Sequence, residues 1–210
     1  VQRAYVLPEL AFPKNASKIG GITMNEKIPE ILQQIETVVV GKNDHPSVNL
    51  ENESNDILLE EKAAYYFIRM IEDLNKNHLN KIIPDSGYRT IEKQEKILEF
   101  YLKCDGDKAY ERVALPRTSE HHTGLAIDIA MIKDDKYTDE ISGNEPEIIE
   151  LHNICHKYGF ILRYPKDKTE ITGYEYEPWH FRFIGLELAK KIYDTKLTLE
   201  EIKQKENNMI

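Results

Sequence analysis

The sequence predicts an α+β fold, with a small, mostly antiparallel sheet flanked by helices. Residues 124–130 and 179–183 alternate large apolar side chains with polar or small ones, as half-buried strands do. In several other segments apolar residues recur three or four positions apart, which is the spacing of amphipathic helices. The 210 residues fit one domain with extensions, or at most two small domains, and they contain no internal repeat and no membrane-spanning apolar run.

The first part of the chain is predicted to form an N-terminal extension that packs on the core or leads into it. Prolines and a Gly-Gly pair interrupt residues 1–55, so only short elements fit there. A helix is expected at about 25–36, followed by a β-branched run at 37–40 and a polar loop at 43–55. Residues 56–210 are predicted to form the main domain.

The main domain is predicted to begin with a helix over about 56–77. Its apolar face is formed by Leu59, Ala63, Phe67, Met70 and Leu74. A short strand at 81–84 and a turn at 86–89 follow this helix. Thr90 is placed to cap a second helix that runs to about Cys104.

The strand at 124–130 follows a predicted connection over 105–118 and separates two kinds of residue. Its large apolar side chains, Leu125, Ile127 and Ile129, point to one side. Asp128 points to the other side together with Gly124 and Ala126. The face of Asp128 is therefore nearly bare, which leaves room for a metal ion and a substrate.

The remaining elements follow from the same patterns. In order they are a helix at 145–158, a strand at 160–164, a polar hairpin tip at 165–170, a return strand at 179–183, a helix at 185–193 and a final helix from Thr198. Thr198 and Glu201 have the spacing of a capping box. Glu177 and His180 have opposite parity along a regular strand, so we expect a bend or bulge at Pro178 if both serve one site.

Composition excludes one class of partner. The formal net charge is −9, with 37 acidic and 28 basic residues, and no basic stripe with interleaved aromatics is present. Nucleic-acid binding is therefore not expected, and the net charge favours a soluble monomer. Cys104 and Cys155 lie in predicted helices, and we expect two buried free thiols rather than a disulfide.

The cellular compartment is predicted from the start of the chain alone. The chain begins at Val1 rather than Met, which suggests a trimmed product. We therefore expect a protein that acts outside the cytoplasm, with a signal peptide or membrane anchor in a longer precursor. The cytoplasm is the alternative.

Two short segments carry the most specific chemistry. Residues 119–128 place a histidine seven positions before an aspartate, and Glu177 stands three positions before His180. Two imidazoles and a carboxylate suit a three-ligand zinc site with one open position. Glu177 is then the spare carboxylate that can act as general base, as in a zinc peptidase. Because His121 and His122 are neighbours, only one of them should bind the metal in an extended segment.

A competing histidine pair lies on the helix predicted at 145–158. His152 and His156 are four positions apart, which is a legitimate zinc spacing. The zinc-helix motif requires a glutamate directly after the first histidine, and Asn153 stands there instead. An exposed or capping pair is the favoured interpretation.

Three further residues are candidates for substrate contacts. Arg89 lies at the less favourable end of a helix dipole, which favours a guanidinium in the cleft over a surface ion pair. Such a group suits a carboxylate or a developing oxyanion. Ser119 is either a turn residue or a hydroxyl donor to the substrate. Gln94 is either solvated or in contact with the peptide.

In this order, the motifs resemble the zinc D-Ala-D-Ala carboxypeptidases of vancomycin resistance, of the VanY and VanXY type. These belong to the wider lysostaphin, D-Ala-D-Ala metallopeptidase and hedgehog group. The resemblance covers about 56–195 and runs through residues 86–89, 118–128, 159–165 and 171–180. It makes 56–210 the catalytic domain, whereas the first fifty or so residues match the family only weakly.

The resemblance also implies a role for individual residues. His121, Asp128 and His180 match the zinc ligands, and Glu177 matches the catalytic base. Arg89 matches the arginine that positions the substrate and stabilises the tetrahedral intermediate. The implied substrate-binding residues are Ser119, Arg89, Gln94 and Tyr88. Two positions depart from the family: Arg117 replaces a usual glycine, which adds bulk and charge beside the cleft mouth, and His122 replaces a frequent glutamine.

The activity that this resemblance implies is removal of the C-terminal D-Ala from peptidoglycan stem pentapeptides or their precursors, with Zn²⁺ as cofactor. The same site would also suit an L,D-carboxypeptidase, a bifunctional D,D-dipeptidase and carboxypeptidase, or a wall endopeptidase. A zinc-binding module without catalysis is the alternative from another class. It is disfavoured because Glu177 would have no purpose there.

Overall fold

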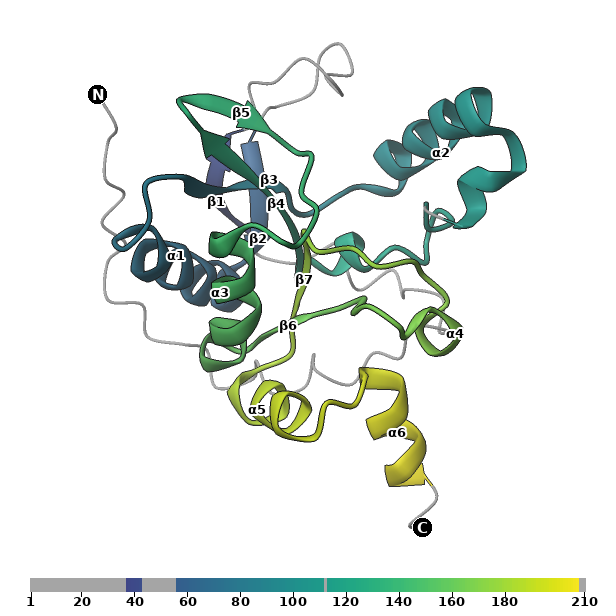
Figure 1. The fold of residues 1–210 in the computed structure, drawn as a ribbon. Coiled ribbons are helices and arrows are strands. Elements are labelled where there is room, and N and C mark those ends of the chain that lie inside the picture. Colours follow the sequence, from purple (N-terminus) through teal and green to yellow (C-terminus); the bar gives the residue numbers. More distant parts are fainter. Residues whose placement is uncertain (1–36, 43–55, 112, 208–210) are drawn as a thin grey trace.

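The computed structural model describes residues 37–42, 56–111 and 113–207. These residues form the predicted α+β fold, in which helices surround a small antiparallel sheet (Figure 1). The helix expected at 25–36 and the loop expected at 43–55 lie outside the described residues. No helix in the described part of the chain is both long and apolar enough to cross a membrane.

The described residues form seven strands, six α-helices and three short 3-10 helices. The strands are β1 (Thr37–Lys42), β2 (Asp56–Glu60), β3 (Lys81–Ser86), β4 (Ala126–Lys133), β5 (Lys136–Thr138), β6 (Phe160–Leu162) and β7 (His180–Phe183). The α-helices are α1 (Glu61–Asn75), α2 (Ile91–Asp105), α3 (Pro146–Ile154), α4 (Thr169–Thr172), α5 (Leu186–Thr195) and α6 (Leu199–Asn207). The 3-10 helices are η4 (Gly106–Glu111), η5 (Glu120–Thr123) and η6 (Cys155–Tyr158).

The main sheet has five strands in the order β3-β4-β7-β6, with β5 paired to the far end of β4. All of its pairs are antiparallel. Asp128 of β4 lies opposite His180 of β7 on one edge and opposite Ser86 of β3 on the other. The register therefore brings together residues that are distant in the sequence.

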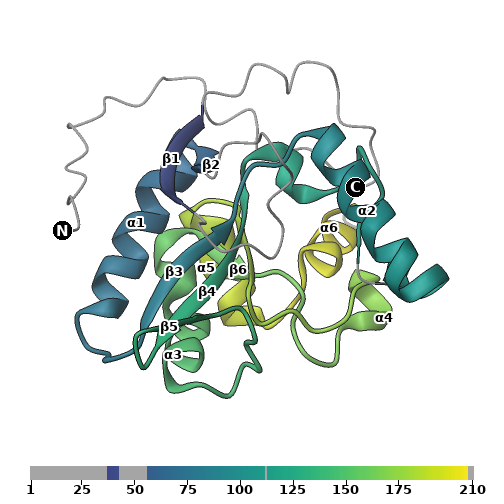
Figure 2. The same ribbon diagram turned by 90° about the horizontal axis from the view of Figure 1, so that it is seen from above.

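The two faces of this sheet have different contents, as the alternation predicted. Ile127 and Ile129 of β4 and Phe181 of β7 join one buried apolar cluster with Phe67 and Met70 of α1. Asp128 and His180 lie on the opposite face. In both views α1 and α2 lie on opposite sides of the sheet (Figures 1 and 2).

The first element of the main domain differs from the prediction. Residues 56–60 form β2, which pairs with β1, and the helix begins only at Glu61. The side chain of Glu60 accepts a hydrogen bond from the Ala63 N–H at 3.0 Å and so caps this helix. Leu59 is fully buried from the strand rather than from the helix.

Two segments predicted to be extended or turn-like contain short helices. His121 and His122 lie in η5, which ends at Gly124 in the left-handed region with φ 66°. The predicted hairpin tip after β6 contains α4, although β6 and β7 do pair as antiparallel strands. The predicted connection at 105–118 begins with η4.

Both predicted helix caps are present. Thr90 caps α2, since its Oγ1 accepts from the Lys93 N–H at 3.1 Å. The capping box at α6 is complete: the Thr198 N–H donates to Glu201 Oε2 at 2.7 Å, and the Glu201 N–H donates to Thr198 Oγ1 at 3.2 Å.

The two cysteines are both free thiols, but the prediction that both are buried is wrong for Cys104. Cys104 is exposed near the end of α2, a helix in which only Gln94 and Leu98 are buried. Cys155 is buried, and burial raises the pKa of its thiol to about 12.

This difference predicts the labelling pattern of the native protein. A thiol reagent at pH 8 should modify one cysteine quickly, and Cys104→Ser should abolish that reaction, because only a thiolate in contact with solvent reacts. Mass spectrometry counts the labels, and unfolding in urea should expose Cys155 as well. Two fast labels in the native protein would contradict the described burial.

The core packing predicts a second result. Phe67 is fully buried, so Phe67→Ala should lower the free energy of unfolding by about 3–5 kcal/mol, because it removes buried contacts and leaves a cavity. Phe100→Ala is the matched control, since Phe100 is 58% exposed and should cost less than about 1 kcal/mol. Urea denaturation of both variants measures the difference, and equal losses would contradict this core.

Candidate metal centre and active site

Three predicted ligands meet on the polar face of the sheet. His121 comes from η5, Asp128 from β4 and His180 from β7, and their ligand atoms all lie within 4.8 Å of one another. His121 Nε2 lies 3.2 Å from Asp128 Oδ2, and His180 Nδ1 lies 2.8 Å from Asp128 Oδ1. Tetrahedral coordination with bonds of about 2.1 Å spaces its ligands by about 3.4 Å, so these separations fit one small metal ion.

The far nitrogen of each ring has an acceptor that orients the ring. His121 Nδ1 lies 2.8 Å from the Gly87 carbonyl oxygen, which can only accept, so its Nε2 keeps the lone pair. His180 Nε2 lies 3.4 Å from Glu120 Oε2, which leaves Nδ1 toward Asp128. This is the second contact that metal-binding histidines usually make. The donor set therefore fits a metal ion in both composition and orientation.

The backbone around Gly87 explains why η5 and the 86–89 turn meet here. A Cβ on Gly87 would lie 2.1 Å from the Leu58 carbonyl oxygen of β2, so only glycine fits against that strand. The next N–H, of Tyr88, donates to the same oxygen at 2.6 Å. Tyr88 itself is half-buried beside the site.

His122, the neighbour of the ligand, has a different partner. Its Nδ1 lies 2.6 Å from the Arg89 carbonyl oxygen, and its Nε2 accepts from the Arg117 N–H at 3.2 Å. Arg117 has φ 72°, a left-handed conformation that glycine adopts without strain, and its side chain is exposed.

Charge in the site is set by burial and by close partners. Burial and the nearby Arg89 lower the pKa of His121 to about 4, so its imidazole is neutral, as a metal ligand must be. Burial also opposes charge on His180, but the carboxylates of Asp128 and Glu120 outweigh it and raise the pKa to about 10. Burial disfavours the ionised form of Asp128 too, yet the two histidines hold its pKa well below the usual range.

Glu177 lies just outside β7, on the bend predicted at Pro178. The His180 N–H donates to the Glu177 carbonyl oxygen at 3.1 Å, which closes a turn, and Glu177 Oε2 lies 3.8 Å from His180 Nδ1. Burial, together with the charges of Asp128 and Glu120, raises the pKa of Glu177 to about 7 even though His180 opposes the shift. A carboxylate of this kind suits proton transfer near neutral pH.

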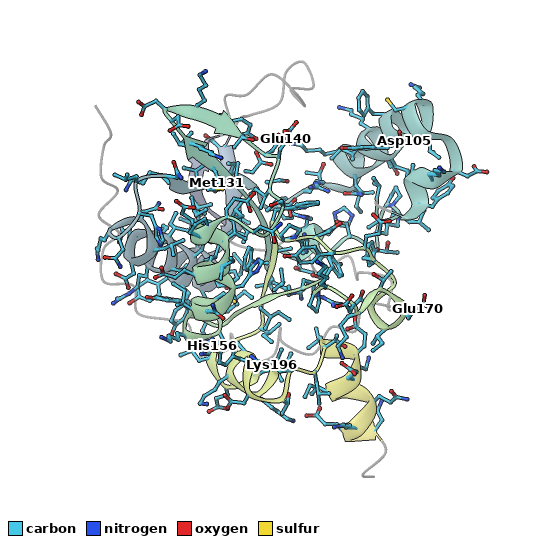
Figure 3. The ribbon with its side chains drawn as sticks, in the orientation of Figure 1. Asp105, Met131, Glu140, His156, Glu170 and Lys196 are labelled. Atoms are coloured by element: carbon cyan, nitrogen blue, oxygen red, sulfur yellow. The ribbon has the colours of Figure 1, made fainter. Side chains whose placement is uncertain are left out.

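The competing histidine pair does not form a second metal site. His152 Nε2 lies 3.0 Å from the Pro178 carbonyl oxygen, so this ring supports the turn that carries Glu177. His156 stacks on Tyr193 at 3.6 Å between ring centroids, with Lys196 against the same tyrosine. Figure 3 labels His156 and Lys196, which lie in the lower part of that view. The predicted exposed or capping pair is therefore wrong, because both rings are half-buried and engaged with α5 or the turn.

Arg89 points into the site, as predicted. Its Nη2 donates to Ser86 Oγ at 2.9 Å and lies 3.6 Å from Asp128 Oδ2, while Nη1 donates to Gln94 Oε1 at 2.8 Å. Among the described residues, nothing accepts a hydrogen bond from its buried Nε. An unpaired buried N–H beside a metal centre is a ready donor for a substrate oxygen.

Two further predicted substrate contacts, Gln94 and Ser119, are buried. Gln94 is 1% exposed, and its amide donates to the Ala114 carbonyl oxygen at 2.7 Å while it accepts from Arg89. Gln94 is therefore not solvated, and its contact in this structure is with Arg89. Ser119 is also buried, directly before η5, and its carbonyl oxygen accepts from the His122 N–H at 3.2 Å.

Glu120, which no sequence pattern singled out, is buried between the candidate metal ligands and two arginines. Arg163 Nε donates to Glu120 Oε1 at 2.8 Å, and Arg182 Nη1 lies 3.5 Å from the same oxygen. Burial opposes the charge of Glu120, yet these two cations hold its pKa far below the usual range. The sequence did contain a signal for this role: Arg163 and Arg182 lie inside predicted apolar strands. A buried charge requires a partner of opposite charge, so an acidic residue was to be expected beside them.

Residues 56–186 match the family model of VanY, D-alanyl-D-alanine carboxypeptidase. This chain belongs to that family. The match runs from β2 to the first residue of α5, so it includes every metal-centre residue described above. The rest of α5 and all of α6 lie beyond it.

Two curated proteins illustrate the relationship. The chain is 41% identical over 145 residues to YodJ of Bacillus subtilis, covering 69% of this chain and 53% of that protein. It therefore spans about half the length of YodJ. It is 39% identical over 152 residues to the bifunctional D-Ala-D-Ala dipeptidase and carboxypeptidase VanXYC of Enterococcus gallinarum, covering 70% of this chain and 78% of that protein.

Two solved structures have similar folds. One is the LdcB LD-carboxypeptidase, with a TM-score of 0.67 and 34% identity over 87% of this chain and 80% of that chain. The other is a mutant VanY D,D-pentapeptidase from a VanB-type resistance cassette in complex with Zn(II). Its TM-score is 0.62, with 37% identity over 74% of this chain and 89% of that chain.

The geometry predicts one divalent metal ion per chain. With Zn²⁺ as the probe, Asp128→Asn and His180→Ala should each weaken binding by more than about 100-fold, because the first removes the negative charge of a candidate ligand and the second removes a candidate ligand altogether. His156→Ala is the control, since His156 stacks on Tyr193 away from the site and should leave binding unchanged. Competition with a chromogenic chelator measures the affinities. Tight binding by Asp128→Asn would argue against this site.

Proposed function

We propose that this protein is a zinc-dependent D,D-carboxypeptidase that removes the C-terminal D-Ala from peptidoglycan stem pentapeptides or their precursors. One observation carries the proposal: the spare carboxylate of Glu177 lies 3.8 Å from His180, in a His, Asp, His ligand set whose two histidines are buried. Membership of the VanY family supports the reaction class. The partner is then a peptide that ends in D-Ala-D-Ala.

Zinc is the proposed metal because of the donor set. Two imidazoles and one carboxylate are typical zinc ligands, and three protein ligands leave one position open. The VanY structure that resembles this chain is described in complex with Zn(II). When bound, zinc would act as a Lewis acid toward the scissile carbonyl and lower the pKa of a water molecule.

Glu177 is the proposed general base and acid. Its carboxylate takes the proton from the attacking water and later gives it to the amine of the departing D-Ala. A group with a pKa of about 7 can do both near neutral pH, because neither protonation state is strongly disfavoured. The turn at Pro178, supported by His152, holds it near the ligands.

Arg89 is the proposed anion-binding group. Its buried Nε–H is free of partners in the described residues, so it can donate to the carbonyl oxygen as negative charge develops. Ser86 and Gln94 fix the other two nitrogens of the guanidinium. We propose Ser119 and Tyr88, with Arg89, as donors to the terminal carboxylate of the substrate, and Gln94 as the residue that orients Arg89.

An L,D-carboxypeptidase is the second candidate. The structure of the LdcB LD-carboxypeptidase resembles this chain with a TM-score of 0.67 over 87% of its length. The two activities differ in the configuration of the residue before the cut, which the metal ligands do not sense. Because the chain is also similar to the bifunctional VanXYC, cleavage of free D-Ala-D-Ala is a third activity to measure.

We further propose that the protein acts as a monomer outside the cytoplasmic membrane, with the cytoplasm as the alternative. Support comes from the substrate, since the stem peptides of the mature wall lie outside that membrane. Cell fractionation with an antibody to the protein tests the location, and light scattering of the purified protein tests the oligomeric state.

The substrate is tested by measuring D-Ala release from a muramyl pentapeptide, a muramyl tetrapeptide and free D-Ala-D-Ala. We expect release from the pentapeptide that stops when the metal is chelated and returns with Zn²⁺. Release from the tetrapeptide alone would replace the proposal with the L,D activity. Added cleavage of the dipeptide would make the enzyme bifunctional, and no release from any of them with zinc bound would reject a carboxypeptidase.

The base is tested by Glu177→Gln, which keeps the shape of the side chain but cannot take a proton. We expect kcat/KM to fall by about 10²–10⁴-fold while zinc affinity stays within a few fold, because Glu177 is outside the ligand set. Glu175→Gln is the matched control, since Glu175 is exposed two positions earlier. A zinc-loaded Glu177→Gln variant with full activity would rule out this assignment.

A further inference from the structure

A continuous series of charged side chains joins the last helix to His180. Glu200 of α6 accepts from Arg163 Nη2 at 2.5 Å and from Nη1 at 3.3 Å. The Nε of the same arginine donates to Glu120 Oε1 at 2.8 Å, and Glu120 Oε2 lies 3.4 Å from His180 Nε2. The side chains of Arg163 and Glu120 are 0% and 3% exposed, so water does not screen them.

The geometry gives Glu200 control over the orientation of Arg163. A guanidinium is planar, so a carboxylate that binds both terminal nitrogens also fixes the direction of the remaining N–H. Here that remaining N–H is the Nε–H that holds Glu120. The ring of Tyr164 packs against the guanidinium at 4.9 Å and restricts its tilt further.

The charges of this series also balance. Two guanidinium groups, of Arg163 and Arg182, face Glu120, and Glu200 supplies the second carboxylate. Removing the charge of Glu200 would leave two cations against one carboxylate directly behind a metal ligand. A divalent cation binds less well beside excess positive charge.

Helix α6 is fixed firmly enough to transmit this effect. Its first turn carries the capping box of Thr198 and Glu201, and Lys168 binds Glu201 at 3.0 Å. Ile202 packs in a small buried cluster with Ile161 of β6. The helix lies below the sheet in Figure 1, beside α4 and α5. Arg163 spans the distance from this helix to Glu120.

We propose that Glu120 and Glu200 are positioning residues for His180, so that α6 supports the metal centre although it lies outside the family match. Glu120 holds the ring with its Nδ1 toward the metal, and Glu200 holds Glu120 in place through Arg163. This inference rests on the proposed metal site. It adds a function for a C-terminal segment that the reaction itself does not use.

The test measures Zn²⁺ affinity by chelator competition and the visible spectrum of the Co²⁺-substituted protein, which reports ligand geometry. Glu120→Gln should weaken Zn²⁺ binding by about 10–100-fold, as loss of a histidine's outer partner does, and Glu200→Gln by a smaller factor of about 3–10. Both should alter the Co²⁺ spectrum, and Glu200→Asp should restore part of the loss. Glu206→Gln is the matched control, because Glu206 lies on the same helix in an exposed pair with Lys191.

A variant that carries both Glu120→Gln and Glu200→Gln tests whether Glu200 acts through Glu120 or affects the metal site independently. If Glu200 acts through Glu120, Glu200→Gln should add no further loss of affinity in the Glu120→Gln background. Additive losses, or a Glu200→Gln variant identical to Glu206→Gln, would overturn the proposal. Thermal unfolding of each metal-free variant checks folding, and if Glu120→Gln does not fold, the partly exposed Glu200 still carries the test. A wild-type protein that binds no Zn²⁺ would instead reject the metal site itself.

Discussion

The pairing of β4 with a strand on each edge is the constraint on which the rest of the structure depends. Its alternation sends Ile127 and Ile129 into the core and Asp128 to the opposite face, between His180 and Ser86. A slip of one residue would bury the aspartate among apolar side chains and expose the isoleucines. Each buried isoleucine stabilises the fold by about 1.5–3 kcal/mol, so core packing holds the geometry of the polar face.

Strand β2 has a comparable influence on the loops above that face. The Tyr88 N–H donates to the Leu58 carbonyl oxygen, and the Glu60 N–H donates to the Gly124 carbonyl oxygen at 2.9 Å. One short strand therefore holds both the turn before α2 and the end of η5. Because these contacts are between main-chain atoms, the backbone positions of Arg89 and His121 are fixed. The guanidinium and the imidazole then need only short side-chain contacts to complete the site.

Much of the fold and most of the site could be predicted from local patterns. The alternation around Asp128, the bend at Pro178 and the two helix caps are visible within a few residues of sequence, and the structure agrees. The start of α1 was not predicted, because Leu59 and Ala63 are four positions apart, a spacing that keeps a strand residue and a helix residue on the same side. The contact of Glu120 with Arg163 joins residues 43 positions apart, so no local pattern contains it.

The two candidate histidine ligands differ in the kind of group that orients them, and this difference affects how mutation can change metal affinity. His121 is oriented by the carbonyl oxygen of Gly87, an atom that every amino acid has, so its support is lost only if the backbone itself moves. Gly87 cannot change without such a movement, because any side chain would collide with β2. His180 depends on the side chain of Glu120, which a single substitution can remove. Substitutions that change metal affinity by small steps should therefore be found around His180. Around His121, a substitution should either leave the affinity unchanged or disrupt the backbone that supports the ring.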